Sequence, residues 1–517
     1  MWNQIYDPFN NIWLSALVAA LPILFFILAM TVLKLKGYVA ALLSIVIASL
    51  VAIFAYDMPA LRLIGSSVHG VLTGIYPVAT IVIGAIFLYK LSVHTGKFEI
   101  IKSSITSISD DKRIQVLLIA YCFGAFLEGA AGFGAPVAIT AVILVGLGFD
   151  SIKAAGLCLV ANIAGGSFGA MGIPVTTPAT LTNLDGLVVA SKTAIIIPFI
   201  SFFVAFLLVY LIDGFKGIKE TLPAILVCGG TFAIVQYIVL VTLGAVLVDI
   251  ISAIASLVAL AVFMRFWKPS TSGNKQQSTQ NTKEVFVAWL PFILLTLIVI
   301  LFSYIKNSPK LTLVIQGIHE QIMKVPPVVS EPSTIQAVFS LPLISTTSAI
   351  FVAALLTIFI YKISMKTIGI CFKETLQELF IPIVTICSVL AFAYICNYSG
   401  ISSTLGLAFA STGKLFPLFS PILGWIGVFL TGSVVNSGSL FAPLQTITAT
   451  QLAIDPSAMV ASNVMGGDMA KMISPQSVAV ASAAVGLAGK EGQIFKYTIK
   501  ISVILLIIVG ILNLIIN

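Results

Sequence analysis

The sequence predicts an all-α polytopic membrane protein built from two inverted repeats, and three observations lead to this prediction. Hydrophobic residues make up 59% of the 517 residues and charged residues only 9%, whereas soluble domains carry about 25% charged residues. Apolar runs near the length of about 20 residues that a bilayer requires recur along the chain, for example at 12–33, 222–243 and 285–305. One short phrase also occurs in both halves of the chain.

The repeated phrase carries an asparagine, two adjacent glycines, a methionine and a proline at equal offsets. Its two copies are Asn162, Gly165, Gly166, Met171 and Pro174, and Asn463, Gly466, Gly467, Met472 and Pro475. Adjacent glycines and a proline are expected to break a helix, and breaks at matching positions of two halves point to a transporter binding site. For one copy alone, close helix packing would be the favoured interpretation. The duplication favours a binding site.

Basic residues lie between the apolar runs, as cytoplasmic loops require. Lys34 and Lys36 follow the first run, and no Lys or Arg precedes them. We therefore expect a retained first helix rather than a signal peptide, an N-terminus outside, and a C-terminus outside after about twelve crossings. The net charge of +8 reflects these loops, so no nucleic-acid partner is expected. The six cysteines lack metal-ligand spacing, so neither a metal nor a disulfide framework is expected.

The spans fall into two sets of the same order. The first repeat is 1–213, with a re-entrant hairpin at 114–148 and a broken helix at 154–180; the second is 285–517, with its hairpin at 413–454 and its broken helix at 458–488. The remaining spans are expected at 12–33, 38–56, 71–91, 190–212, 285–305, 345–361, 377–397 and 494–516. Two connecting helices in 214–267 and a polar cytoplasmic linker at 268–284 join the repeats. By the loop charges, one hairpin enters from the cytoplasm and the other from outside, so the repeats are inverted.

Both hairpins carry glycine and proline at their midpoints, in 128–136 and 431–443. Irregular backbone inside a membrane must face protein or a water-filled cavity, so the two hairpins and the two broken helices should converge. Helix N-termini exposed there would seat a small carboxylate. The residues predicted to bind substrate are Asn162, Gly165, Gly166, Asn436, Ser437, Asn463, Gly466, Gly467 and Lys471.

Glu128 and Asp468 are the predicted proton-coupling residues. Glu128 lies among apolar neighbours in the first hairpin, where an ionisable group is a functional candidate and can bind and release a proton. The alternative is a structural partner for a lysine or a backbone N–H. Asp468 and Lys471 are three residues apart and would share a helix face. Either they form a structural ion pair, or Lys471 binds the substrate carboxylate and Asp468 is its partner or a second proton carrier.

Three blocks closely resemble the bacterial L-lactate permease family: FGAFLEGAAGFGAP at 123–136, GAMGIP at 169–174 and KMISPQ at 471–476. The resemblance covers essentially the full length. It implies uptake of L-lactate, and also of D-lactate and glycolate, by proton symport across the bacterial cytoplasmic membrane, with no enzyme activity and no cofactor. It also suggests kinship with transporters that use an elevator motion, an analogy of fold. A homodimer is the candidate assembly.

Glu128 and Lys471 match the family blocks. Some members of the family carry an acidic residue where this chain has Val434, and a neutral one at Asp468. Neither of these two positions is therefore expected to be essential to a shared mechanism, and Glu128 is the better candidate for proton coupling.

Other functions remain to be weighed. Sodium-coupled carboxylate transport stays open, because unwound carbonyls and hydroxyls could bind Na⁺. An intramembrane serine protease needs a histidine or lysine base, and with the three histidines away from the glycine-rich tips only Lys471 could serve. A channel is disfavoured, because four interrupted segments suit an occluded site better than an open pore. ATP coupling is unsupported, because the chain has no Gly-x-x-x-x-Gly-Lys-Ser/Thr loop.

Overall fold

The computed structural model describes residues 1–517 except 34, 133, 270–280, 306–307 and 488–489. Ten of its helices are long and apolar enough to cross a membrane, or up to eleven if the bent pair at 151–181 counts as one span. This count takes the 46-residue helix α13 (Ile197–Thr242) as one, although Asp213 and Gly214 break it. The chain is therefore a multi-pass membrane protein. The predicted linker at 268–284 lies mostly outside the described residues.

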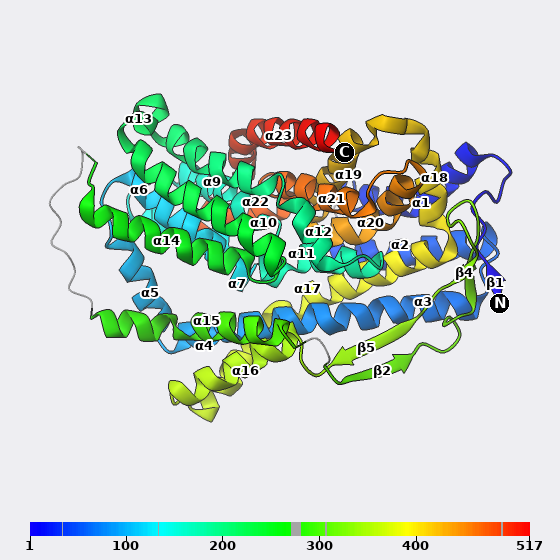
Figure 1. Cartoon of the computed structure of the whole chain (residues 1–517), viewed down its shortest axis with the longest axis horizontal. Helices are drawn as coiled ribbons and strands as arrows, with labels where there is room; N and C mark the ends of the chain where they lie inside the picture. The colour runs from blue at the N-terminus through cyan, green and yellow to red at the C-terminus, as the bar shows by residue number, and fades with distance from the viewer. Residues whose placement is uncertain (34, 133, 270–280, 306–307, 488–489) are drawn as a thin grey trace.

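Most elements before the linker are helices (Figure 1). In chain order they are β1 (Trp2–Asn3), α1 (Ile12–Thr31), α2 (Gly37–Phe54), α3 (Ala60–Thr73), the π-helix η1 (Gly74–Ala79), α4 (Thr80–His94), α5 (Lys97–Thr106), α6 (Lys112–Val116), the π-helix η2 (Leu117–Phe123), α7 (Gly124–Ala130), α8 (Ala135–Gly146), α9 (Ser151–Ala161), α10 (Ile163–Gly166), α11 (Gly169–Leu181), α12 (Gly186–Thr193), α13 (Ile197–Thr242) and α14 (Val248–Phe266).

The elements after the linker include four short strands. They are α15 (Thr282–Ser303), β2 (Lys310–Val314), β3 (Ile322–Lys324), β4 (Ser333–Thr334), β5 (Val338–Pro342), α16 (Thr346–Ile360), α17 (Met365–Ser399), α18 (Ile401–Phe409), the 3₁₀ helix η3 (Ala410–Leu415), α19 (Phe416–Thr431), α20 (Val434–Gln451), α21 (Pro456–Lys471), α22 (Pro475–Ala484) and α23 (Glu491–Ile516).

Short polar side chains begin many of the helices. Asn11 caps α1, Asp150 caps α9, Asp185 caps α12 and Asp455 caps α21, each by accepting a hydrogen bond from a backbone N–H of the first turn. These caps satisfy donors that have no partner inside the helix. They separate consecutive apolar helices and so define where each begins.

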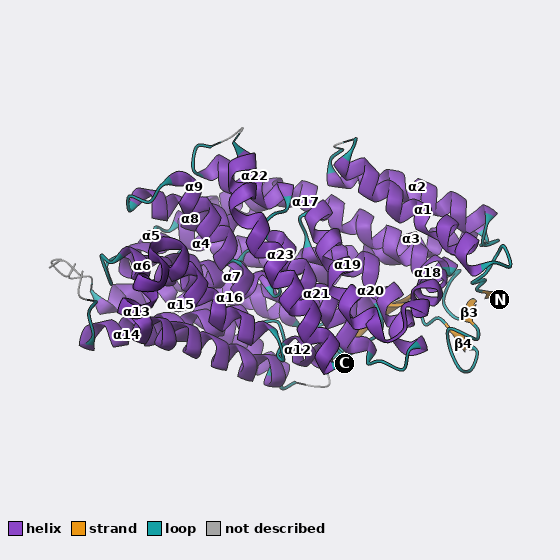
Figure 2. Ribbon diagram, turned by 90° about the horizontal axis from the view of Figure 1, so that it is seen from above, coloured by secondary structure: helices purple, strands orange, loops and turns teal. Residues whose placement is uncertain are grey.

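The strands were not predicted. β2 pairs antiparallel with β5, from Lys310 opposite Pro342 to Val314 opposite Val338. β1 pairs parallel with β3, and β3 pairs antiparallel with β4; β3 and β4 lie near the N-terminus (Figure 2). A two-residue strand carries almost no sequence signal, because its stability depends on the partner strand. For β1 that partner lies in the other half of the chain.

Two helical regions extend beyond their predicted spans. α17 begins at Met365 rather than near 377, and the helical stretch predicted at 71–91 runs from Ala60 to His94. The additional turns of α17 are polar, which a hydropathy criterion assigns to a loop. Glu374 on this extension lies 2.8 Å from His94 Nε2 and 3.7 Å from Lys90 Nζ. These charged contacts with α4 help to hold the extension against its neighbour.

Both copies of the repeated phrase contain a helix break, but the glycine pairs themselves are helical and the breaks follow them. Gly466 and Gly467 lie inside the continuous helix α21, and the break follows at 472–474. Gly165 and Gly166 lie in α10, and the left-handed residues come later, at Ala170, Met171 and Gly172 with φ of 47°, 64° and 74°. The glycines instead permit close packing, because a Cβ on Gly466 would overlap the carbonyl oxygen of Pro421.

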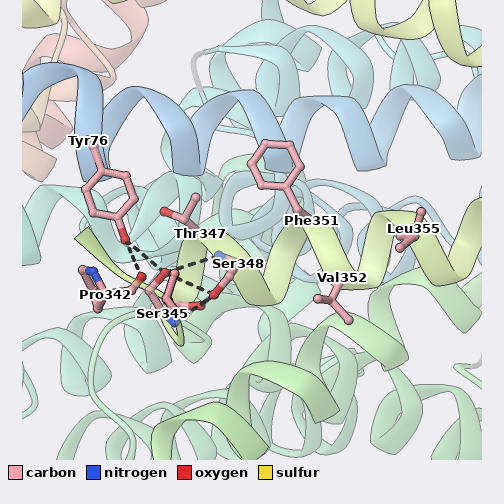
Figure 3. A pocket seen from close by; sticks show the side chains of 9 residues that line it. Tyr76, Pro342, Ser345, Thr347, Ser348, Phe351, Val352 and Leu355 are labelled. Atoms are coloured by element: carbon pink, nitrogen blue, oxygen red, sulfur yellow. Dashed lines mark hydrogen bonds between the residues drawn. The ribbon is translucent and has the colours of Figure 1, made fainter. Parts of the chain in front are cut away.

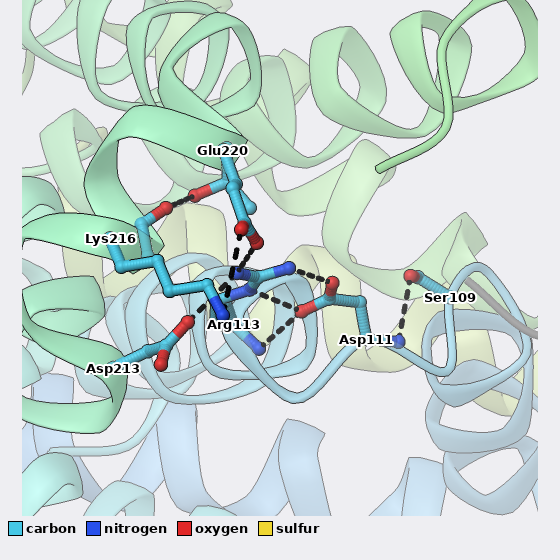
Figure 4. Close-up of polar contacts among 8 residues, drawn as sticks. Ser109, Asp111, Arg113, Asp213, Lys216 and Glu220 are labelled. Carbon is cyan, nitrogen blue, oxygen red and sulfur yellow. Dashed lines mark hydrogen bonds and ion pairs between the residues drawn. The ribbon is translucent and has the colours of Figure 1, made fainter. Parts of the chain in front are cut away.

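Arg113 lies at the start of the helical segment Lys112–Ala130, which carries Glu128, and holds it against α13 (Figure 4). Its guanidinium donates to Asp111 Oδ2 at 2.7 Å, to Asp213 Oδ2 at 2.9 Å and to Glu220 Oε2 at 2.7 Å. Asp213 lies at the break of α13, so the cluster ties that break to the start of α6. A buried guanidinium requires such partners. Between Arg113 and Glu128 the same segment passes through the π-helix η2. Such π-helical turns are frequent at functional sites.

Candidate substrate and proton site

The hairpin tips and the broken helices converge on one cavity of about 490 Å³. Glu128 and Gly132 line it from the first hairpin, and Gly166 from the first broken helix. The second half contributes the stretch 431–436 from its hairpin and Lys471 from its broken helix. Helices α2 and α17 supply further lining residues, among them Tyr38 and Thr385. The convergence expected from the membrane environment is therefore present.

Glu128 is the charged residue at the centre of this site. It is only 1% exposed, and its Oε1 accepts a hydrogen bond in an ion pair with Lys471 Nζ. Asn162 Nδ2 donates to its other carboxylate oxygen at 2.8 Å. A Cβ on Gly169 would overlap Glu128 Oε1, so glycine is required there to leave room for the carboxylate. The lysine belongs to the second half of the chain, whereas the carboxylate and the asparagine belong to the first.

Asp468 has a different partner from the one the sequence suggested. Ser167 Oγ donates to Asp468 Oδ2 at 2.7 Å, while Lys471 pairs with Glu128. Asp468 is 0% exposed, and it lies behind Gly166, where a Cβ would overlap its Oδ1. Ser167 and Asp468 occupy the same offset in the two copies of the repeated phrase. This contact therefore joins the two copies of the phrase directly.

The two asparagines of the repeated phrase each contact the hairpin of their own half. Asn162 donates to Glu128, and Asn463 Oδ1 accepts a hydrogen bond from Ser437 Oγ at 3.4 Å. Both asparagines are buried and neither lines the cavity. Their positions are equivalent, but only the first half offers a carboxylate to its asparagine.

Four of the eleven predicted site residues line the cavity, namely Glu128, Gly166, Asn436 and Lys471. The others lie behind its wall. These are Asn162, Gly165, Ser437, Asn463, Gly466, Gly467 and Asp468. The glycines among them make room for neighbouring chain, while the polar residues among them contact cavity-lining groups or the adjacent backbone.

Helix N-termini point to the kind of ligand that the cavity accepts. The first turn of α20 lines it with Val434 and Asn436, and the first turn of α22 lines it with Gln476 and Ser477. The N–H groups of Asn436 and Ser477 donate to the cap serines Ser433 and Ser474, so it is the helix dipole at these ends that favours an anion. The sequence analysis missed Gln476 and Ser477. A Ser-Pro pair directly before them is a typical helix start and could have identified this N-terminus.

A second hollow, of about 450 Å³, lies between η1 and α16 (Figure 3). The Tyr76 hydroxyl at its edge lies 3.3 Å from the Pro342 carbonyl oxygen and 3.1 Å from Ser345 Oγ. None of its nine lining residues is charged. A carboxylate would find no cation there, in contrast to the cavity that Lys471 lines.

Comparison with known proteins identifies the family of this chain. A family model described as L-lactate permease matches residues 15–517. The L-lactate permease of Escherichia coli K12 is 46% identical over 99% of this chain and 98% of its own length. The L-lactate permease of Bacillus subtilis is 44% identical with the same coverage. Glycolate permease GlcA of Escherichia coli K12 is 44% identical over 99% of this chain and 97% of its own length.

A solved structure, that of the YdaH transporter of Alcanivorax borkumensis, aligns over 86% of each chain with a TM-score of 0.46 and 14% identity. The family match and the full-length relatives are decisive, because both span nearly the whole chain. They also confirm the expectation of a transporter rather than an enzyme, since these relatives are permeases. The chain belongs to the L-lactate permease family, and its similarity to these permeases supports a function in lactate transport across the membrane.

Proposed function

We propose that this protein takes up L-lactate, D-lactate and glycolate into the bacterial cytoplasm by symport with a proton. The observation that carries the proposal is the ion pair between Glu128 and Lys471 at the wall of the cavity. The names of the relatives, L-lactate permease and glycolate permease, support small 2-hydroxymonocarboxylates as the substrates. The pair joins a candidate carboxylate-binding group to a candidate proton-binding group.

The pair couples the two ligands by competition. A lactate carboxylate that binds Lys471 replaces Glu128 as the partner of the lysine. Glu128, which is 1% exposed, then has no counter-ion. An uncompensated buried carboxylate is destabilised by about 3–5 kcal/mol, and a proton on Glu128 removes that charge. Lactate therefore binds best when Glu128 is protonated, and a proton binds Glu128 best when lactate holds Lys471. Such mutual dependence is the thermodynamic basis of symport.

The remaining lining groups suit the rest of the substrate. The N-termini of α20 and α22 attract the carboxylate together with Lys471. Asn436, Gln476 and Ser477 on these first turns offer donors and acceptors to a neighbouring hydroxyl. The substrate would thus contact the second half of the chain, while the proton would reside on the first half.

The contacts between the halves support two inverted repeats with the boundaries expected above. Asn162 and Asn463 occupy equal positions and each contacts the adjacent hairpin. Ser167 and Asp468 also occupy equal positions and bind each other. In this arrangement both termini lie outside, and the loop that contains Lys36 lies in the cytoplasm. The pseudosymmetric frame would present the same site to each side in turn.

Uptake by purified protein in liposomes tests the proposal. We expect an inward pH gradient to drive accumulation of labelled lactate in sodium-free buffer, and a protonophore to abolish it. Excess unlabelled D-lactate or glycolate should compete with the labelled L-lactate. A requirement for sodium, with no response to the pH gradient, would refute proton coupling and favour the sodium alternative.

A further inference from the structure

Asp249, the second residue of α14, is a buried carboxyl that the function proposed above does not use. It is 1% exposed and does not line the cavity. Neither of its carboxyl oxygens has a hydrogen-bond partner among the described residues. Burying a polar group without a partner is costly, and burying an ionised carboxylate costs far more. The sequence analysis did not single out this residue.

The Asp249 side chain packs against the two irregular stretches that carry the proton site. A Cβ on Gly165 would lie 3.0 Å from Asp249 Oδ2, and a Cβ on Gly129 would lie 2.7 Å from Asp249 Cβ. Gly129 directly follows Glu128, and Gly165 lies three residues after Asn162, which donates to Glu128. The two glycines therefore allow α14 to bring its carboxyl up to the Glu128 site from outside the cavity.

Three ionisable groups act on Asp249 across these contacts. They are Glu128 on α7, and Asp468 and Lys471 on α21. The two carboxyl groups disfavour a negative charge on Asp249, and the single lysine that would favour one is paired with Glu128. Within the described part of the chain, an ionised Asp249 would thus have no counter-ion of its own. Burial without a hydrogen-bond partner or a counter-ion therefore favours the neutral, protonated form of this carboxyl.

We infer that Asp249 is a second proton-binding residue of the transport cycle, and this inference rests on the proton coupling proposed above. Glu128 is charged while it is paired with Lys471, and Asp249 holds a proton. When a substrate carboxylate binds Lys471, the Glu128 carboxylate is released and can move to within hydrogen-bond distance of Asp249; the O–H bond on Asp249 then breaks as one forms on Glu128, so the two carboxyls share one proton and one negative charge. A second proton, from cavity water, then leaves both carboxyls neutral. An intramembrane acid is retained for such work.

The test compares Asp249→Asn with wild-type protein in liposomes. Asparagine resembles a protonated carboxyl in shape but cannot release its protons. Accumulation of labelled lactate under an inward pH gradient should fall about tenfold or more, while exchange of labelled for unlabelled lactate without a gradient stays within about twofold of wild type. Asp249→Ser, which is smaller, should behave in the same way and provides a second neutral variant.

Ser252→Ala is the matched control. Ser252 lies one turn along α14, is 0% exposed, and its Oγ has no hydrogen-bond partner among the described residues. It carries no titratable group, so its removal should leave both activities at the wild-type level. This control separates the loss of a proton-binding group from the loss of a buried oxygen.

Three results would overturn the inference. Normal pH-driven accumulation in Asp249→Asn or Asp249→Ser would show that a permanently neutral side chain suffices. Loss of gradient-free exchange in both variants would assign Asp249 to folding or substrate binding. Wild-type uptake that ignored the pH gradient would instead refute the proposed proton coupling, and with it this inference. If the pH gradient drives lactate accumulation equally well in wild-type protein and in the Asp249 variants, the role of Asp249 is refuted but the proposed proton coupling is not.

Discussion

Replacing Lys471 with methionine tests whether the ion pair with Glu128 has the energetic role described. Methionine keeps much of the volume of the lysine stem but removes the charge. Glu128, 1% exposed, would keep the hydrogen bond from Asn162 but lose its counter-ion. Removing one partner of a buried pair typically destabilises a protein by about 3–5 kcal/mol. We expect a loss of this size in the free energy of unfolding of Lys471→Met at neutral pH.

A double variant distinguishes the loss of the Glu128–Lys471 ion pair from the loss of side-chain packing at Lys471. Adding Glu128→Gln to Lys471→Met removes the uncompensated charge, and replacing both members of a buried pair is often close to neutral. The double variant should therefore be more stable than Lys471→Met alone, by about 2 kcal/mol or more. Acid should also lessen the defect of the single variant, because protonation of Glu128 neutralises the buried charge.

Equilibrium unfolding in mixed detergent micelles, with the free energy extracted for each variant, provides the assay. Lys153→Met is a suitable control, because Lys153 is an exposed lysine at the start of α9. A double variant as unstable as Lys471→Met, or a Lys471→Met defect that acid leaves unchanged, would refute the reasoning. Lactate binding measured on the same samples should be lost in both Lys471 variants.

Three further predictions follow from the contacts. Gly169→Ala should displace the Glu128 carboxylate and raise the KM for lactate about tenfold, whereas Gly230→Ala, with nothing within 4 Å of the added Cβ, should transport normally. Glu128→Gln should abolish pH-driven accumulation but spare lactate exchange; intact accumulation would exclude Glu128 from coupling. Burial favours a higher pKa for Asp455, but hydrogen bonds, chiefly from Lys192 at 2.7 Å, outweigh it and hold the pKa below its usual value. Their stabilisation is present above the usual pKa and is lost as the pH falls through the lowered one. Lys192→Ala should thus lower the free energy of unfolding by at most about 1 kcal/mol at neutral pH and less near pH 3; an equal effect at both would contradict this origin.

Local patterns accounted for much of the membrane fold. Hydropathy located most of the long spans, because burial in lipid demands an unbroken apolar run. Glycine and proline located the stretches that meet at the cavity, because irregular backbone cannot face lipid. The same patterns placed the first break correctly within the repeated phrase, but directly after its glycine pair rather than at it. Gly165 and Gly166 are helical, since a glycine permits a break but equally permits a close contact.

Elements that depend on distant partners were missed. The strand β1 pairs with β3 from the other half of the chain. The polar start of α17 is held against α4 through Glu374 and His94. In both cases the residues themselves carry little intrinsic preference, and the partner determines the structure.

The sequence by itself determined that the chain crosses a membrane many times, and it identified Glu128 and Lys471 as candidate site residues, with a structural role as the alternative for each. The tertiary structure alone decided their relation. Lys471 binds Glu128, which lies 343 residues away in the sequence, and not its near neighbour Asp468. It also brought Asp249 from a connecting helix against Gly129 and Gly165, behind the same site. The physical reason is that an ion pair depends on distance and burial, and these arise only when the helices of the two halves pack together.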